Sequence, residues 1–281
     1  MRSRAASILP LTLTTLLTLA GLNLAVGRAA AQEAAVKPLK ALLVIGGCCH
    51  DYKMQKELLA QGLAARAHVE VTVAYDPDTT TMHLNPVYEN PQWAKGFDVV
   101  IHDECSSNVK DLTVIDRILG PHREGLPAVV LHCGMHSYRS EGYPNVTPWF
   151  EFTGLQSTGH GPQAPIDVKF SVADSPIVKG FADWTTINEE LYNNSAGKLL
   201  DTAAALARGR QITKNKKGEE STGDYIVVWT NNYRGTKVFA TTLGHNNETV
   251  GDSRYLDLVT RGLLWSCGKL DGRYLKSAGG K

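Results

Sequence analysis

The chain has 281 residues, and its 29 lysine and arginine side chains against 28 aspartate and glutamate side chains give a formal charge of +1. A nearly neutral chain without a basic stripe is a poor candidate for nucleic-acid binding. Its five cysteines cannot all pair with one another, so we exclude a disulfide scaffold and expect at least one free thiol.

The first 31 residues have the pattern of a secretory signal peptide. Arg2 and Arg4 precede an apolar run over residues 8–26, and small residues at Ala29 and Ala31 form a cleavage site of the A-x-A type. We expect cleavage after Ala31 and a periplasmic or secreted product. An uncleaved membrane anchor is the competing interpretation, because the apolar run is almost long enough to span a bilayer.

Cleavage removes three arginines and no acidic residue, which changes the formal charge from +1 to −2. Residues 32–39 are expected to be a flexible lead-in, and residues 40–281 a single domain, which is long enough to bury a sizeable core. No other stretch is apolar enough to span a bilayer, so we expect no membrane contact after cleavage.

Strands and helices are expected to alternate in the first half of the domain. The continuous apolar run at residues 40–46 is typical of a buried parallel strand, and residues 53–67 carry leucines at helical spacing. Further strands are predicted at residues 69–75, 97–104 and 127–134, with a helix at 112–120. This alternation indicates βαβ units and a parallel sheet.

The second half is predicted to be richer in strands. A polar loop at residues 138–165 precedes strands at 166–172, 203–209, 224–232 and 237–245 and a final helix at 255–267. The one basic cluster, at residues 214–218, is interpreted as a solvated turn.

Three of the predicted strands end in residues that can carry chemistry, in the sequences GGCCHD, HDECSS and HCGMHS. Parallel strands place their carboxyl ends at one edge of the sheet, where open α/β sheets bind ligands. The residues expected to converge there are Cys48, Cys49, His50, Asp51, Asp103, Glu104, Cys105, His132, Cys133 and His136. The sequence therefore predicts an active edge.

Some of these residues also have a purely structural interpretation. Cys48 and Cys49 are expected to be buried as small apolar side chains, since a disulfide between adjacent cysteines would be strained. His102 lies inside a predicted strand and is expected to be a hydrogen-bonded core or edge histidine. Gly46 and Gly47 are expected to form a tight turn, and they lack the G-x-G-x-x-G pattern of dinucleotide binding.

Two kinds of chemistry stay open for this edge. Five histidines could provide ligands for a divalent metal, and they are His50, His132, His136, His160 and His245. They form no compact ligand motif in the sequence. Alternatively, Cys133 could be a nucleophile at a strand-to-helix turn, with His245 and Glu248 as its partners.

Four stretches in chain order resemble the ThuA-like (trehalose-utilisation) family. They are LLVIGGCCHDY, VVLHCG, the segment from GHGPQAPIDVKF to INEELYN, and the segment from VVWTNNYRG to RGLLWSCG, and they span about residues 40–269. The resemblance implies a three-layer α/β sandwich with a mostly parallel sheet, of the flavodoxin and class I glutamine amidotransferase type. Two departures are Ser175, where a His-Pro pair is usual, and RGTKVF, which replaces a more glycine-rich turn.

The resemblance also bears on the nucleophile. It places His132, not Cys133, at the position of the amidotransferase nucleophile, which argues against glutaminase activity. It places His245 at the position of the amidotransferase histidine. Glu248 lies two residues beyond the usual spacing of the glutamate, so a working triad is not expected. The family implies sugar metabolism, on 3-keto glucosides or disaccharides.

A 3-keto sugar has an acidified proton at C2, which a neutral histidine can remove if a donor stabilises the enolate oxygen. We expect His132, His245, Glu190 and His50 to be catalytic, leading to hydrolysis, elimination or isomerisation. Substrate contacts are expected from Asp51, Cys133, His136, His160, Tyr192 and Asn246.

The partner is expected to be a small-molecule carbohydrate, no cofactor is predicted, and a divalent metal and a homo-oligomer stay open. One alternative is a metal-assisted hydrolase on the same edge. The other is a non-catalytic carbohydrate-binding module, in which aromatic residues stack on sugar faces. The aromatic candidates are Trp149, Phe150, Trp184 and Tyr233.

Overall fold

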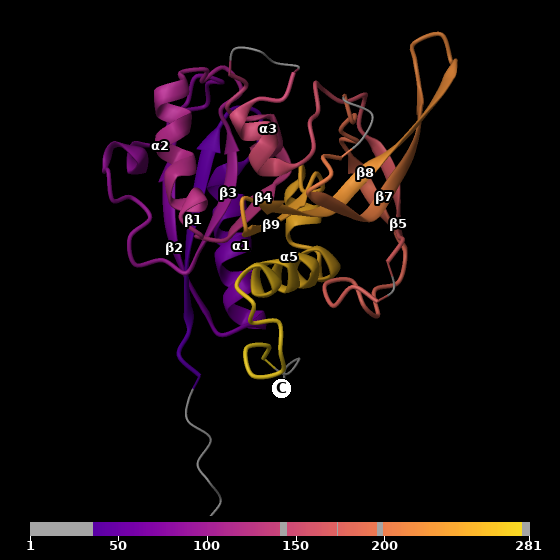
Figure 1. Ribbon diagram of the computed structural model, residues 1–281. Coiled ribbons are helices and arrows are strands. Elements are labelled where there is room, and N and C mark those ends of the chain that lie inside the picture. The colour runs from indigo at the N-terminus through magenta and orange to yellow at the C-terminus, as the bar shows by residue number, and fades with distance from the viewer. Residues whose placement is uncertain (1–35, 141–144, 173, 196–198, 277–281) are drawn as a thin grey trace, which may run out of the picture. The chain divides into compact units, whose positions relative to one another are not determined.

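A nine-stranded sheet organises the chain, with strand order β2-β1-β3-β4-β9-β8-β7-β5-β6 (Figure 1). The computed structural model describes residues 36–140, 145–172, 174–195 and 199–276, so the expected signal peptide lies outside the described residues. Within these ranges, no helix is both long and apolar enough to cross a membrane. The strands are β1 Leu39–Gly47, β2 Val69–Asp76, β3 Val99–Cys105, β4 Ala128–Leu131, β5 Ala164–Phe170, β6 Trp184–Glu189, β7 Ala203–Lys214, β8 Glu220–Tyr233 and β9 Thr236–Thr241.

The sheet has a parallel half and an antiparallel half. All pairings from β2 through β1, β3 and β4 to β9 are parallel. The pairings from β9 through β8, β7 and β5 to β6 are antiparallel. The predicted α/β fold is confirmed, and the carboxyl ends of β1, β3, β4 and β9 share one edge, as a parallel arrangement requires.

Helices cover both faces of the parallel half, which gives the three predicted layers. The helices are α1 Tyr52–Arg66, α2 Leu112–Arg123, α3 Pro148–Thr153, α4 Asn247–Val250 and α5 Ser253–Ser266, with 3-10 turns η1 Pro86–Glu89 and η2 His132–His136. Alternate residues of β1 enter different cores. Leu43 and Ile45 pack with α1 and α5, whereas Leu42 and Val44 pack with α2 and α3 (Figure 1).

Two glycines shape the end of β1. Gly46 and Gly47 both have positive φ, at 147° and 95°. A Cβ on Gly47 would lie 2.4 Å from the carbonyl oxygen of Cys105 on β3, and one on Gly46 would lie 2.7 Å from that of Asp76. The two glycines still belong to β1, and the chain bends at residues 48–50, one position later than the predicted turn; close backbone approach excludes a larger residue at either glycine.

The structure differs from the prediction in several places along the chain. The strand β6 and the short helix α3 were not expected, and the strand predicted at residues 127–134 ends at Leu131, where η2 begins. β6 has mostly polar residues and several exposed positions, so its sequence lacks an apolar run. The basic cluster at residues 214–218 is the exposed turn between β7 and β8, as predicted.

Candidate functional site

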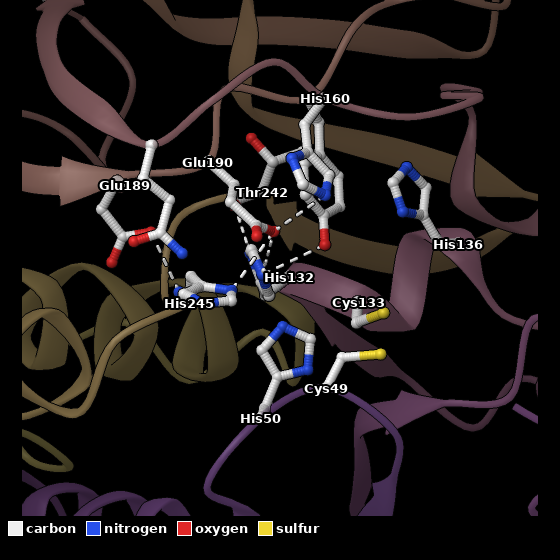
Figure 2. A network of polar contacts seen from close by, with 12 residues as sticks. Cys49, His50, His132, Cys133, His136, His160, Glu189, Glu190, Thr242 and His245 are labelled. Atoms are coloured by element: carbon white, nitrogen blue, oxygen red, sulfur yellow. Dashed lines mark hydrogen bonds and ion pairs between the residues drawn. The ribbon is translucent and has the colours of Figure 1, made fainter. Parts of the chain in front are cut away.

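Three histidines and one glutamate meet beside the carboxyl ends of the parallel strands (Figure 2). His50 follows β1, His132 is the first residue of η2 after β4, and His245 follows β9. Glu190 follows β6, the last strand in the sheet order. We call these four residues the histidine–glutamate cluster.

Glu190 lies at the centre of the contacts. Its Oε2 atom is 3.2 Å from Nδ1 of His245, 3.3 Å from Nε2 of His160 and 3.6 Å from Nε2 of His132 (Figure 2). His160 is the most exposed of these side chains, at 37 %, whereas His132 is almost fully buried. The cluster is therefore accessible from the side of His160.

Backbone carbonyls fix the orientation of two imidazoles. Nδ1 of His132 lies 2.6 Å from the carbonyl oxygen of Thr242, and Nδ1 of His50 lies 3.1 Å from that of Cys48. A carbonyl only accepts, so each Nδ1 carries the proton and donates it. In the neutral rings the Nε2 atoms are then acceptors, and that of His132 receives a hydrogen bond from the Tyr192 hydroxyl at 3.0 Å.

Burial and charge separate the protonation states within the cluster. Burial, together with the neighbouring His132 and His245, lowers the pKa of His50 to about 2, so this ring is neutral. Burial opposes ionisation of Glu190, but the neighbouring His132 and His245 rings hold its pKa well below the usual range. Burial also works against the charged form of His245, yet its contact with Glu190 raises the pKa of this ring.

Glu189 supports the cluster and was not predicted from the sequence. It is fully buried, and its two carboxylate oxygens accept the backbone N–H groups of His245 at 3.0 Å and Asn246 at 3.1 Å. The Asn246 side chain donates to the carbonyl oxygen of Asn188 at 2.7 Å. These bonds join the loop after β9 to the end of β6. The only sequence signal was the adjacent pair of glutamates.

His136 and Tyr192 lie behind His132. Their rings stack at 3.9 Å between centroids, and Nε2 of His136 lies 2.8 Å from the hydroxyl of Ser157. Both side chains are buried, so they position His132 through the Tyr192 hydroxyl. His136 thus lies in a supporting position behind His132, and its contact with substrate stays a prediction.

Asp51 and Glu248 lie outside the histidine–glutamate cluster. Asp51 caps α1, accepting the N–H of Met54 at 3.2 Å, and its second oxygen accepts from the Asn247 side chain at 2.8 Å. Glu248 is exposed on α4, and the carboxylate that contacts His245 is that of Glu190. Asp51 therefore ties α1 to the loop that carries His245.

The expectation for Cys48 and Cys49 was partly wrong: Cys48 is buried as expected, but Cys49 is exposed and the two are bonded. Cys48 and Cys49 form a vicinal disulfide, and Cys105 pairs with Cys133, while Cys267 carries the free thiol that the odd count predicted. Cys49 has a φ of 82°, a left-handed conformation that the prediction did not consider when it treated the pair as incompatible. The disulfide of Cys133 leaves it no thiolate to act as a nucleophile in this form.

The polar residues of β3 belong to the layer beneath the edge. His102 is fully buried, with its Nδ1 2.9 Å from Glu104 Oε1 and its Nε2 3.1 Å from Nε2 of His122, as expected for a core histidine. The Tyr88 hydroxyl donates to the same carboxylate at 2.6 Å. Burial and the charge of Glu104 raise the pKa of Asp103 to about 8. Tyr88, His102, Glu104 and His122 form a separate core network, whereas Asp103 alternates to the other face of the strand.

The sequence matches the family model described as trehalose utilisation over residues 40–266, most of the chain. The chain belongs to the ThuA family. The family's description associates it with sugar metabolism. No curated protein matches the sequence closely enough to extend this association.

Solved structures of ThuA-like proteins share the fold. A putative ThuA-like protein from Parabacteroides merdae has a TM-score of 0.62 and 18% identity, covering 87% of this chain and 94% of its own. A second ThuA-like protein, from Bacteroides uniformis, has a TM-score of 0.58 and 15% identity, covering 85% of this chain and 95% of its own. A cytoplasmic protein from Salmonella typhimurium has a TM-score of 0.53 and 13% identity, covering 85% of this chain and 100% of its own. At these identities the likeness shows the fold alone.

One large surface cavity of this ThuA-family chain lies away from the cluster. It has a volume of about 770 Å³ and is lined by residues that include Phe181, Trp184, Arg254 and Arg261. Its described lining shares no residue with the histidine–glutamate cluster. Converging imidazole and carboxylate groups are a stronger sign of chemistry than volume, so we place the candidate site at the cluster.

The aromatic residues expected for a sugar-binding module belong to the core. Trp149, Phe150, Trp184 and Tyr233 are all buried. Their faces contact other core side chains, such as Phe152 against Trp149. Trp149, Phe150 and Tyr233 cannot stack on a sugar without unpacking the core, whereas Trp184 also lines the surface cavity described above.

Proposed function

We propose that this protein is an exported enzyme of carbohydrate catabolism that acts on glucosides or disaccharides, including their 3-keto forms, at the histidine–glutamate cluster. The ThuA family supports the substrate class. The observation that carries the catalytic role is the carboxylate of Glu190 within 3.2–3.6 Å of three imidazoles from three different loops. Buried charges of this kind contribute little to packing and are typical of catalytic sites.

The geometry suits proton transfer on a keto sugar. A carbonyl at C3 acidifies the proton at C2, and the Nε2 atom of neutral His132 has the lone pair needed to remove it. The Tyr192 hydroxyl, 3.0 Å from that atom, and His245 beside Glu190 are the donors that could stabilise the enolate oxygen or protonate a leaving group. Elimination, hydrolysis or isomerisation can follow from the same enolate.

Incubation with glucosides, disaccharides and their 3-keto forms tests this function. We expect at least one sugar to be converted, with products identified by mass spectrometry and chromatography, which also separates isomers of equal mass. A preparation of His68→Ala should convert the same sugar, because His68 precedes β2 at the opposite edge of the sheet. Sugar binding by calorimetry without any product would contradict the enzyme and favour the binding module.

Export is proposed from the sequence of residues 1–31. Intact-mass analysis of the protein from its native host should give a mature chain that begins at Gln32. A mass that includes Met1 would contradict cleavage and support a membrane anchor.

A further inference from the structure

We propose that His50, His132, His245 and Glu190 bind one divalent first-row transition ion, with Zn²⁺ the best match to three imidazoles and one carboxylate. This inference rests on the proposed function, because it names a cofactor for the same site. One ligand atom from each residue lies within 4.8 Å of all the others. Ligand atoms on one tetrahedral ion with bonds of ~2.1 Å are about 3.4 Å apart, so side-chain rotations that draw the ligand atoms inward by about 1 Å complete the site.

Hydrogen-bond acceptors converge on the cluster. Nδ1 of His50, His132 and His160 each contacts a backbone carbonyl, at 3.1 Å, 2.6 Å and 2.9 Å. In their neutral forms these rings therefore direct unprotonated Nε2 atoms away from the carbonyls. Those of His132 and His160 face the carboxylate of Glu190, itself an acceptor, and that of His132 also accepts from the Tyr192 hydroxyl. Nε2 of His50 is buried and has no hydrogen-bond partner among the described residues. A cation resolves this excess of acceptors.

The same carbonyl contacts are those that metal-binding histidines use. A ligating imidazole almost always donates its other N–H to a carbonyl or carboxylate, which fixes the tautomer and turns the lone pair toward the ion. His50 and His132 both have this arrangement, through Cys48 and Thr242. A histidine that only packs in the core does not require the histidines of other loops to have the same carbonyl contact.

Backbone strain occurs at two of the three loops that carry His50, His132 and His245. His132 has a φ of 40°, and Cys49, next to His50, has a φ of 82°. Left-handed conformations are uncommon in residues other than glycine and cluster at functional sites. Here they occur where the chain turns from β4 and β1 to present the two imidazoles.

A bound ion would act as a Lewis acid on a carbonyl or hydroxyl oxygen of the sugar. His132 and His245 would then be ligands, and proton transfer would pass to groups outside the ligand set. His160, 3.3 Å from Glu190, and the Tyr192 hydroxyl are the groups placed for this role. The metal thus changes which residues move protons without changing the location of the reaction.

The test measures metal binding without sugar. Untagged full-length protein is stripped with a chelator, dialysed and titrated with ZnCl₂ by calorimetry, and bound zinc is counted by mass spectrometry. We expect one Zn²⁺ per chain and a higher Tm in its presence. His50→Ala and Glu190→Gln should each weaken binding at least ~100-fold, beyond the effect typical of outer-shell partners. His68→Ala should bind as the wild type does.

Each outcome decides the proposal. Stripped wild-type protein that binds no Zn²⁺, or binding unchanged in both His50→Ala and Glu190→Gln, would overturn it. The Tm of each variant without metal shows that it has folded. Zinc binding without conversion of any sugar would contradict only the proposed function. Full sugar turnover by metal-free protein would contradict a catalytic ion and leave the function standing.

Discussion

Replacing His132 by alanine is expected to lower turnover of the sugar substrate at least about 100-fold, which corresponds to about 2.7 kcal/mol of transition-state stabilisation. The reason is its position between three partners. The ring donates to Thr242, accepts from Tyr192 and faces Glu190. The loss is expected whether His132 acts as the base or binds an ion, because both roles use the same Nε2 atom.

The measurement is kcat/KM for the sugar that the panel identifies. His132→Ala removes a buried ring, so circular dichroism and Tm should be recorded beside the kinetics to show that the variant folds. His68→Ala provides the matched control, as a histidine outside the site. Free imidazole is expected to restore part of the lost rate by occupying the vacated space. Turnover of folded His132→Ala near that of the wild type would rule out this site.

Much of this site follows from the sequence because parallel strands obey a simple rule. His50, His132 and His245 follow three strands that the apolar runs predict, and parallel pairing puts the ends of those strands side by side. The prediction needed no knowledge of side-chain contacts. Asp51 shares the same signal, and the rule could not show that its carboxylate caps α1 and accepts from the Asn247 side chain.

The parts that could not be predicted depend on tertiary structure. Glu190 follows β6, a strand without an apolar run whose loop meets His245 through long-range contacts. The disulfide between Cys48 and Cys49 occurs with a positive φ at Cys49, and this backbone conformation cannot be predicted from the sequence. The family resemblance supplied Glu190 as a candidate, but it could not show that Glu189 holds the loop of His245 in place.

Glu189 and Glu190 are adjacent in sequence, yet their substitution by glutamine is expected to have opposite consequences. Glu190→Gln removes the charge that faces three imidazoles, so we expect turnover to fall about 100-fold while the fold is kept. Glu189→Gln replaces one acceptor by an amide that cannot accept from the N–H of His245 or Asn246. It should destabilise the protein by about 1–3 kcal/mol.

Comparing unfolding with kinetics separates the two roles. Urea denaturation should place the midpoint of Glu190→Gln near that of the wild type and the midpoint of Glu189→Gln clearly lower, with an unchanged slope. Below its unfolding transition, Glu189→Gln should retain more turnover than Glu190→Gln, because the loop of His245 shifts but its chemistry stays. Equal loss of stability in both variants would mean that Glu190 is also a structural residue. Greater turnover in Glu190→Gln than in Glu189→Gln would contradict a catalytic role for the Glu190 carboxylate, which three histidines contact.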